Sequence, residues 1–205
     1  MNRTPDMCLA IPCIPVSDKY KACFHSVKQG ERITFCDERS EVNSKITITA
    51  NEAGVYYSSP EQEIIPQEKN QKKSDYVIFC CTEIGQINFI ELKGQNIDKS
   101  GDRDPFMQIL DTIEYFSKTE GLKTLVSANV EKHVFIVSPM RQKIPMGSSI
   151  SERKLLRKLI SQHKASLNIK VLHYVKFVPK GKYSDNDNRI ICSSNEQLEF
   201  PYRKL

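Results

Sequence analysis

Residues 75–94 read DYVIFCCTEIGQINFIELKG, and this stretch decides which fold the sequence predicts. Two apolar runs of strand length, DYVIFCCT and NFIELKG, flank a short polar break that is typical of a hairpin turn. Charge interrupts the second run twice, at Glu91 and Lys93. Residues two apart in a strand point to the same face, so Glu91 and Lys93 should lie beside each other. Ile90 and Leu92 should then face the other way, into a core.

Asp75 stands at the start of the neighbouring predicted strand. An acid on one strand, with an acid and a lysine on the next, can hold a divalent cation and a water molecule together. This combination is typical of metal-dependent hydrolysis of phosphodiesters. The apolar neighbours of Glu91 predict a mostly buried strand, where a charge needs a partner or a function. The alternative is a chance acid-x-base triplet on a solvated strand.

Length and composition predict one globular domain spanning residues 1–205. The chain has 205 residues, a 39% hydrophobic and 27% charged composition, and a net charge of +5, which is compatible with a polyanionic partner. No apolar run is long enough to span a bilayer, and the N-terminal residues lack the pattern of an export signal. We therefore expect a cytoplasmic protein with no membrane partner. Residues 180–205 are polar and predict a loosely ordered tail.

The seven cysteines are expected to stay reduced, and their odd number argues against a complete disulfide framework. Adjacent Cys80 and Cys81 fall on a predicted strand and are typical of core packing. A zinc site near the N-terminus is an alternative use of these thiols, although the spacing departs from the usual pattern. Its candidate ligands are Cys8, Cys13, Cys23, His25 and Cys36.

The rest of the chain alternates between strand and helix patterns, which predicts an α/β fold with a mixed central sheet and helices on its faces. Residues 61–73 read as an exposed loop, and Asp104-Pro105 as the start of a helix that ends at Gly121. The remaining expected elements are helices at 17–28 and 149–164 and strands at 32–36, 45–50, 134–137 and 171–178.

Asp75 followed by Glu91-Leu92-Lys93 resembles the signature of the PD-(D/E)xK nuclease superfamily, over a core from about Lys45 to Val137. The helix that follows carries Gln108-x-x-x-Thr112, and many members carry a glutamine there. Gln108, Thr112 and Tyr115 fall on one side of that helix. Ser74 replaces the proline of the superfamily's name, a common departure.

The resemblance implies a restriction-endonuclease-like core and a magnesium-dependent endonuclease that cuts nucleic acid, DNA before RNA. Asp75 and Glu91 would ligate Mg²⁺ or Mn²⁺, with the Leu92 carbonyl as a further ligand. Lys93 would orient the attacking water, and Gln108 would position the site or the substrate. Restriction or antiviral defence, a homodimer, and a partner subunit that supplies recognition are associations of the family.

Three questions stay open in the sequence. Members often add an upstream acid, and Glu31, Glu52 and Glu63 are equal candidates. A nuclease fold that binds nucleic acid or protein without catalysis is the main alternative function, and a small zinc-linked regulatory protein is a weaker one. The basic face of the predicted helix at 153–164 fits a nucleic-acid groove or a plain solvated surface.

Overall fold

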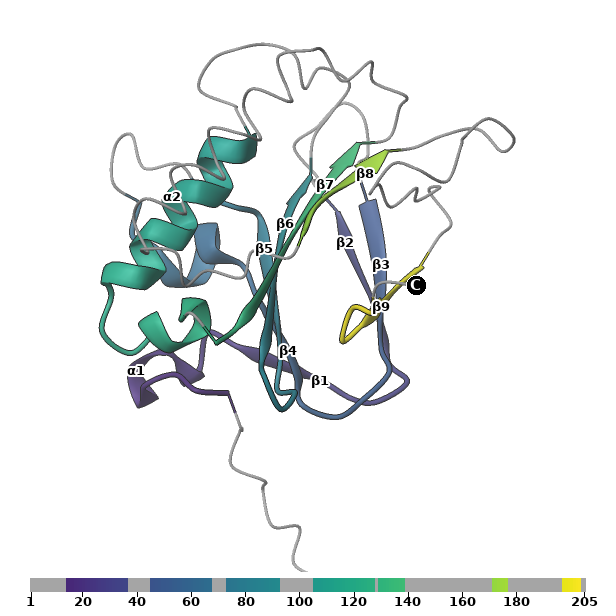
Figure 1. Cartoon of the computed structure of the whole chain (residues 1–205), viewed down its shortest axis with the longest axis horizontal. Helices are drawn as coiled ribbons and strands as arrows, with labels where there is room; N and C mark the ends of the chain where they lie inside the picture. Colours follow the sequence, from purple (N-terminus) through teal and green to yellow (C-terminus); the bar gives the residue numbers. More distant parts are fainter. Residues whose placement is uncertain are drawn as a thin grey trace, which may run out of the picture.

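The computed structural model has a mixed α/β architecture with two mixed sheets and few helices (Figure 1). It describes residues 14–36, 45–67, 73–92, 105–127, 129–138, 171–176 and 197–203.

The larger sheet has six strands in the order β1-β4-β5-β6-β7-β8. From β1 to β6 neighbouring strands are antiparallel, whereas β6, β7 and β8 run parallel to one another. The strands are β1 (His25–Val27), β4 (Val55–Ser58), β5 (Tyr76–Cys80), β6 (Gln86–Leu92), β7 (Glu131–Ser138) and β8 (Val171–Lys176).

The smaller sheet has three strands, with β3 in the middle, antiparallel to β2 and parallel to β9. Its strands are β2 (Arg32–Cys36), β3 (Lys45–Ala50) and β9 (Gln197–Phe200). The helical elements are α1 (Asp18–Lys21), a π-helical turn η1 (Pro60–Ile64), α2 (Pro105–Lys118) and a 3₁₀ turn η2 (Lys123–Val126).

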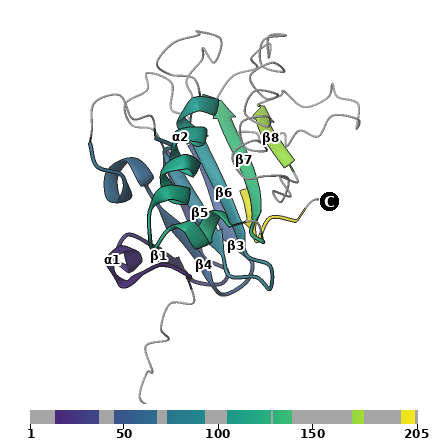
Figure 2. The same cartoon turned by 60° about the vertical axis from the view of Figure 1, so that its left-hand side comes forward.

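Strand β6 is buried on both faces because α2 covers one face of the large sheet and the small sheet covers the other (Figures 1 and 2). Ile87 and Phe89 belong to the core cluster that includes α2. Ile90 and Leu92 point the opposite way and belong to the cluster shared with the small sheet. The predicted buried strand is therefore confirmed, with Phe89 and Ile90 both 0% exposed.

Several predicted elements are confirmed at or near their expected bounds. Strands β2 and β3 occupy residues 32–36 and 45–50, and β7 extends the predicted 134–137 strand to Glu131–Ser138. Helix α2 begins at Pro105 as expected, while its proposed cap, Asp104, lies outside the described residues. The predicted helix at 149–164 also lies outside them.

Helix α2 ends at Lys118, and the chain then turns through Gly121. Gly121 has a φ of +89°, a backbone conformation that residues with a Cβ atom rarely adopt. Its carbonyl accepts a hydrogen bond from the backbone N–H of Ser17 at 3.1 Å. A Cβ atom at this position would collide with the Ser17 side chain, so this close approach requires glycine.

The predicted helix at 17–28 is wrong beyond its first turn. Helix α1 stops at Lys21, and His25–Val27 form strand β1, paired with β4. Phe24 joins the core under α2, whereas Val27 joins the core between the sheets. These two side chains serve opposite faces of a sheet, so strand pairing overrides the helical spacing that the sequence suggested.

Two further expectations need correction. Residues 61–73 are not simply an exposed loop, because η1 lies there and Ile65 and Lys73 are only 3% and 8% exposed. Within the expected loose tail, residues 197–200 form β9, and Leu198 and Phe200 are buried. The short alternation of apolar and polar residues in Gln197–Phe200 gives β9 one apolar face for the core between the sheets.

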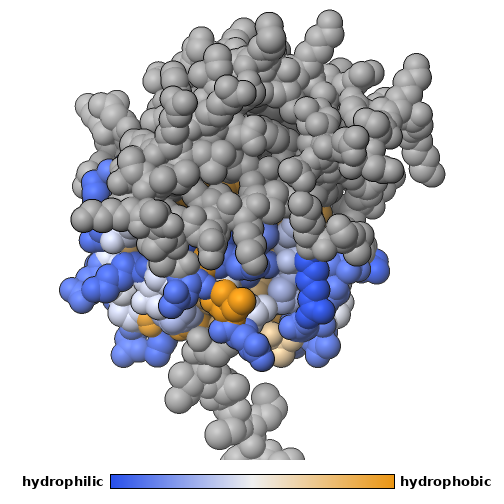
Figure 3. Space-filling model, viewed as in Figure 1, coloured by the Kyte–Doolittle hydropathy of each residue, from blue (hydrophilic) through white to orange (hydrophobic). Residues whose placement is uncertain are grey.

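The coloured surface visible in Figure 3 is mainly hydrophilic, with small apolar patches. Ile84, in the turn between β5 and β6, is the large hydrophobic residue that stands out as exposed in the described part of the chain, at 59%. No helix in the described ranges is long and apolar enough to cross a membrane.

Ile90 and Ile84 offer a matched test of this core. Ile90→Ala should lower the free energy of unfolding by about 2–5 kcal/mol, because the side chain is fully buried between the two sheets. Ile84→Ala deletes the same atoms at an exposed site and should change the free energy by less than about 0.5 kcal/mol. Urea unfolding of both variants measures the difference, and equal effects would contradict the described core.

Candidate active site

Asp75 and Glu91 lie beside each other at the end of the ladder that pairs β5 with β6. Tyr76 pairs with Ile90 in the last register of this antiparallel ladder, which places Asp75 directly beside Glu91. The Asp75 N–H donates a hydrogen bond to Glu91 Oε2 at 3.2 Å. In return, the Leu92 N–H donates to Asp75 Oδ2 at 2.6 Å. Each carboxylate therefore accepts a backbone hydrogen bond from the neighbouring strand.

The two carboxylates differ in burial. Glu91 is 0% exposed and lies on the same face of β6 as Phe89, the face that α2 covers. Asp75 is half-buried. Burial of a carboxylate is costly unless hydrogen bonds, a cation or a proton compensate it. The pair therefore consists of one buried and one more accessible acid near the adjoining ends of β5 and β6.

The residues predicted for this site fall into three groups. Asp75, Glu91 and Leu92 are brought together, as the reciprocal hydrogen bonds show. Gln108 contacts the segment that leads into β5, where its Nε2 donates to the Lys73 carbonyl at 3.1 Å. Lys93, the predicted water-orienting residue, lies outside the described residues.

Helix α2 also holds this segment through Thr112, a residue with no role in the predicted site. The Thr112 hydroxyl accepts a hydrogen bond from the Ser74 N–H at 2.8 Å and donates one to the Gln108 carbonyl at 2.8 Å. Thr112 and Ser74 are both 0% exposed. The one signal in the sequence was the spacing of four residues between Gln108 and Thr112, which places both on one side of the helix.

Lys73 is anchored in the interior rather than presented to solvent. Its ammonium donates hydrogen bonds to the carbonyls of Ile65 at 3.0 Å and Pro66 at 2.6 Å. The residue just before Ser74 is thus tied to the start of the segment that follows η1. Together with Gln108 and Thr112, this contact fixes the backbone that leads into Asp75.

None of the three upstream acids joins Asp75 and Glu91. Glu31 accepts a hydrogen bond from the Lys28 N–H, and Glu52 pairs with Arg203. Glu63 accepts hydrogen bonds from the Ser58 hydroxyl and Ser59 N–H and pairs with His25. Across the described ranges, no group of three or more His, Cys, Asp or Glu side chains is placed to hold a metal ion.

The proposed zinc ligands that the structure describes serve other contacts. The Cys23 thiol donates to the Glu63 carbonyl at 3.3 Å, and burial raises the pKa of this thiol. His25 Nε2 lies 2.5 Å from Glu63 Oε1, and Cys36 is exposed. Cys8 and Cys13 lie outside the described residues.

The expectation that the cysteines stay reduced needs correction at Cys81. Cys23, Cys36 and Cys80 are free thiols, but Cys81 is disulfide-bonded. Cys80 fits the core packing that the sequence suggested, since it is 0% exposed and burial raises the pKa of its thiol to about 12.

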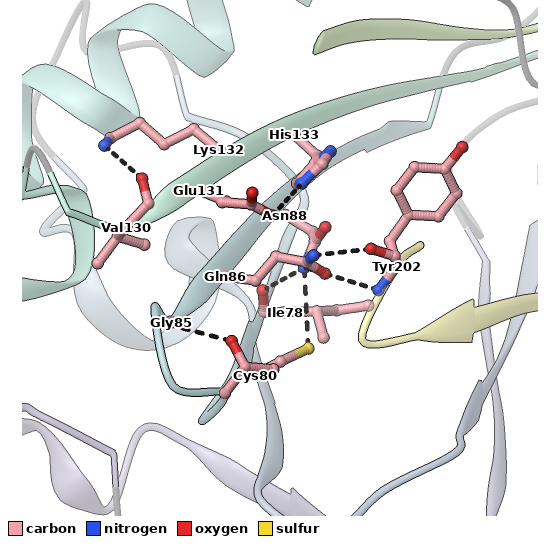
Figure 4. Close-up of polar contacts among 11 residues, drawn as sticks. Ile78, Cys80, Gly85, Gln86, Asn88, Val130, Glu131, Lys132, His133 and Tyr202 are labelled. Carbon is pink, nitrogen blue, oxygen red and sulfur yellow. Dashed lines mark hydrogen bonds and ion pairs between the residues drawn. The ribbon is translucent and has the colours of Figure 1, made fainter. Parts of the chain in front are cut away.

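A second group of buried polar side chains lies at the opposite end of β6 (Figure 4). Gln86 Nε2 donates to the Tyr202 carbonyl at 2.8 Å, and the Tyr202 N–H donates back to Gln86 Oε1 at 2.7 Å. Asn88 donates to the Ile78 carbonyl at 3.2 Å. The Tyr202 ring meets the rings of His133 and Phe135 edge-on. These contacts dock the segment after β9 onto the large sheet, which is a structural role.

Comparisons with known proteins add no relative. The chain matches no protein-family model, no curated protein and no solved structure. A function can therefore be inferred only from the geometry of the site and from the motif in the sequence.

Lys132 is a buried cation outside the candidate site. It is 3% exposed, and its ammonium donates to the carbonyls of Ser127 at 2.6 Å and Val130 at 2.9 Å. Burial lowers the pKa of this ammonium to about 8, from an ordinary value of 10.5. These contacts tie β7 to the end of η2.

Lys132 should make stability depend on pH above neutrality. Between pH 8 and 10.5 the unfolded chain holds the Lys132 proton more tightly than the folded chain does, so deprotonation favours folding. The contribution is fully present above the unfolded pKa and is lost as the pH falls through the folded pKa. As the pH rises across this window, the free energy of unfolding of wild type should increase, relative to that of Lys132→Met, by on the order of 3 kcal/mol.

Urea unfolding of wild type and Lys132→Met at several pH values from 7 to 10.5 measures this gain. Lys123→Met, which replaces an exposed lysine, is the control and should follow wild type at every pH. Parallel profiles for wild type and Lys132→Met would show that the Lys132 proton is not linked to folding.

Proposed function

We propose that this chain is a magnesium-dependent endonuclease of the PD-(D/E)xK type, which hydrolyses phosphodiester bonds in DNA. The observation that carries the proposal is the pairing of Asp75 with Glu91 at the ends of adjacent strands. The backbone hydrogen bonds at 3.2 and 2.6 Å hold the two carboxylates close together, one buried and one partly accessible. Leu92 and Lys93 follow directly after Glu91, as the motif requires.

The arrangement of the large sheet supports a restriction-endonuclease-like core. Strands β4, β5 and β6 form an antiparallel run, and β7 then lies parallel to β6. Helix α2 connects β6 to β7 in sequence and packs on the face that carries Glu91. A mixed sheet with a helix packed on the face that carries Glu91 is the scaffold that the motif predicts.

The donor atoms of Asp75, Glu91 and Leu92 fit Mg²⁺ or Mn²⁺. Mg²⁺ in proteins is commonly bound by one or two carboxylates, with waters and substrate phosphate oxygens completing the coordination. Asp75, Glu91 and the Leu92 carbonyl offer only oxygen, which favours a hard cation over zinc. Two carboxylates are enough for such a site, so a third acidic side chain is not essential.

The bound cation would polarise the scissile phosphate and make a water nucleophilic near neutral pH. In this proposal Asp75 and Glu91 hold the cation, and Lys93 orients the attacking water and counters charge that develops on the phosphate. Gln108 holds the Lys73 carbonyl and so positions the segment that carries Asp75. Work in restriction or antiviral defence, action as a homodimer, and recognition by a partner subunit are compatible extensions of this proposal.

A nuclease fold that binds without cutting is the second candidate function. It is favoured by one observation, that none of Glu31, Glu52 and Glu63 supplements the Asp75–Glu91 pair within the described residues. In that case the chain would bind nucleic acid or protein and leave phosphodiesters intact. A cleavage assay separates the two candidates.

The acids should be essential for cleavage. Wild type incubated with supercoiled plasmid, linear DNA and RNA should cut DNA when Mg²⁺ is present and not when it is chelated. Asp75→Asn and Glu91→Gln should each lower the rate by at least about a hundredfold, because each removes a charged metal ligand. Glu83→Gln, which neutralises an exposed acid in the turn between β5 and β6, should cut like wild type. Wild type that binds DNA without cutting any substrate would favour the binding module.

Lys93→Ala should abolish cleavage and leave the fold intact, since the side chain is assigned to the water and the phosphate rather than to packing. Circular dichroism and urea unfolding report the fold, and the plasmid assay reports the rate. Lys118→Ala removes a lysine that is 72% exposed and should have no effect on either. Undiminished cleavage by Lys93→Ala would remove this residue from the mechanism.

A further inference from the structure

Helix α2 reaches the backbone that leads into Asp75 through one buried hydroxyl. Thr112 Oγ1 accepts the Ser74 N–H at 2.8 Å and donates to the Gln108 carbonyl one turn earlier, also at 2.8 Å. A hydroxyl can donate once and accept as well, so both bonds form together. Thr112 and Ser74 are fully buried, so no solvent is at hand to replace a lost partner.

The Ser74 N–H belongs to the residue directly before Asp75. Asp75 is in turn bonded through its N–H to Glu91 and through its carboxylate to the Leu92 N–H. The described bonds therefore run from α2, through Ser74, to the pair of acids. Gln108 and Lys73 anchor the same segment through other atoms. Gln108 donates to the Lys73 carbonyl, and the Lys73 ammonium donates to a carbonyl just after η1.

We propose that Thr112 is a positioning residue for the metal site: its hydroxyl fixes the Ser74 amide and thereby sets the distance between the Asp75 and Glu91 carboxylates. This inference rests on the proposed function, and it adds a group that neither ligates the cation nor touches the substrate. Loss of the hydroxyl leaves the Ser74 N–H buried without its acceptor, and the strand start shifts to find another. A small shift at Ser74 moves Asp75 relative to Glu91, which separates two oxygens that must meet one cation.

A purely structural role for Thr112 makes a different prediction. Thr112 lies on α2 with Ile109 and Ile113, both buried in the core beneath the helix. Thr112→Val keeps the shape of the side chain and removes only the hydroxyl, whereas Thr112→Ser keeps the hydroxyl and removes a methyl group. If Thr112 only packs, serine should be the more harmful change. If Thr112 positions Asp75, valine should be the more harmful change for metal binding.

The test is calorimetric titration of the full-length chain with Mg²⁺ and with Mn²⁺, alongside urea unfolding and the plasmid assay. Thr112→Val should weaken cation binding about three- to tenfold, the loss expected for one buried hydrogen bond. Thr112→Ser should bind within about twofold of wild type, since its hydroxyl keeps the bond. Ile113→Val is the matched control, because it removes a buried methylene from the same helix and should lower stability without changing cation affinity. If Thr112→Val does not fold, Thr112→Cys, whose sulfur is a weak acceptor, replaces it in the comparison.

The outcomes separate this inference from the proposed function. Wild type that binds the cation and cuts DNA, with Thr112→Val equal to it in affinity and rate, would overturn the positioning role and leave the nuclease intact. Weaker binding by Thr112→Val and Ile113→Val in proportion to their lost stability would also overturn it. Wild type that neither binds the cation nor cuts would overturn the proposed function, and the positioning role with it.

Discussion

The buried carboxylate of Glu91 is the constraint on which the candidate site depends. A charged group with no exposed surface, on a strand covered on both faces, is expensive to keep unless its surroundings compensate the charge. The structure supplies one part of that compensation through the Asp75 N–H, and Asp75 accepts the Leu92 N–H in exchange. A divalent cation between the acids would compensate their charge further, and this is the physical reason for interpreting the pair as a metal site rather than as two surface charges.

The position of this pair follows from the sheet. Strand β6 needs apolar side chains on both faces because α2 and the small sheet cover it from opposite directions. The ladder between β5 and β6 ends at Tyr76 and Ile90, and just beyond it the N–H groups of Asp75 and Leu92 donate to carboxylates across the two strands. The acids thus accept the N–H groups at the strand ends, and Asp75 keeps part of its surface exposed. Hydrogen bonds of Thr112, Gln108 and Lys73 anchor the segment that leads into β5.

Strands with strong local patterns could be predicted from the sequence, and elements defined by distant partners could not. The alternating residues of β2 and β3 and the Asp104-Pro105 start of α2 identify themselves locally. His25–Val27 became a strand only because β4 offers a pairing edge, and Gln197–Phe200 because β3 does. The adjacency of Asp75 and Glu91, by contrast, followed from the local hairpin pattern. The role of Thr112 depends on a contact across 38 residues, which no local pattern reveals.

The choice among the three candidate upstream acids could not be made from the sequence for the same reason. Glu31, Glu52 and Glu63 were equivalent in the sequence, and the fold assigns each to a separate contact, with Lys28, Arg203 and the Ser58–Ser59 segment. Glu31 lies between β1 and β2, Glu52 between β3 and β4, and Glu63 in η1, so their different neighbours are a property of the assembled fold.

Anomalous diffraction from crystals grown or soaked with Mn²⁺ locates a bound cation without relying on activity. We expect a manganese peak at about 2.1 Å from a carboxylate oxygen of Asp75 and from one of Glu91. Well-ordered Asp75 and Glu91 side chains with no manganese between them, at millimolar Mn²⁺, would contradict it.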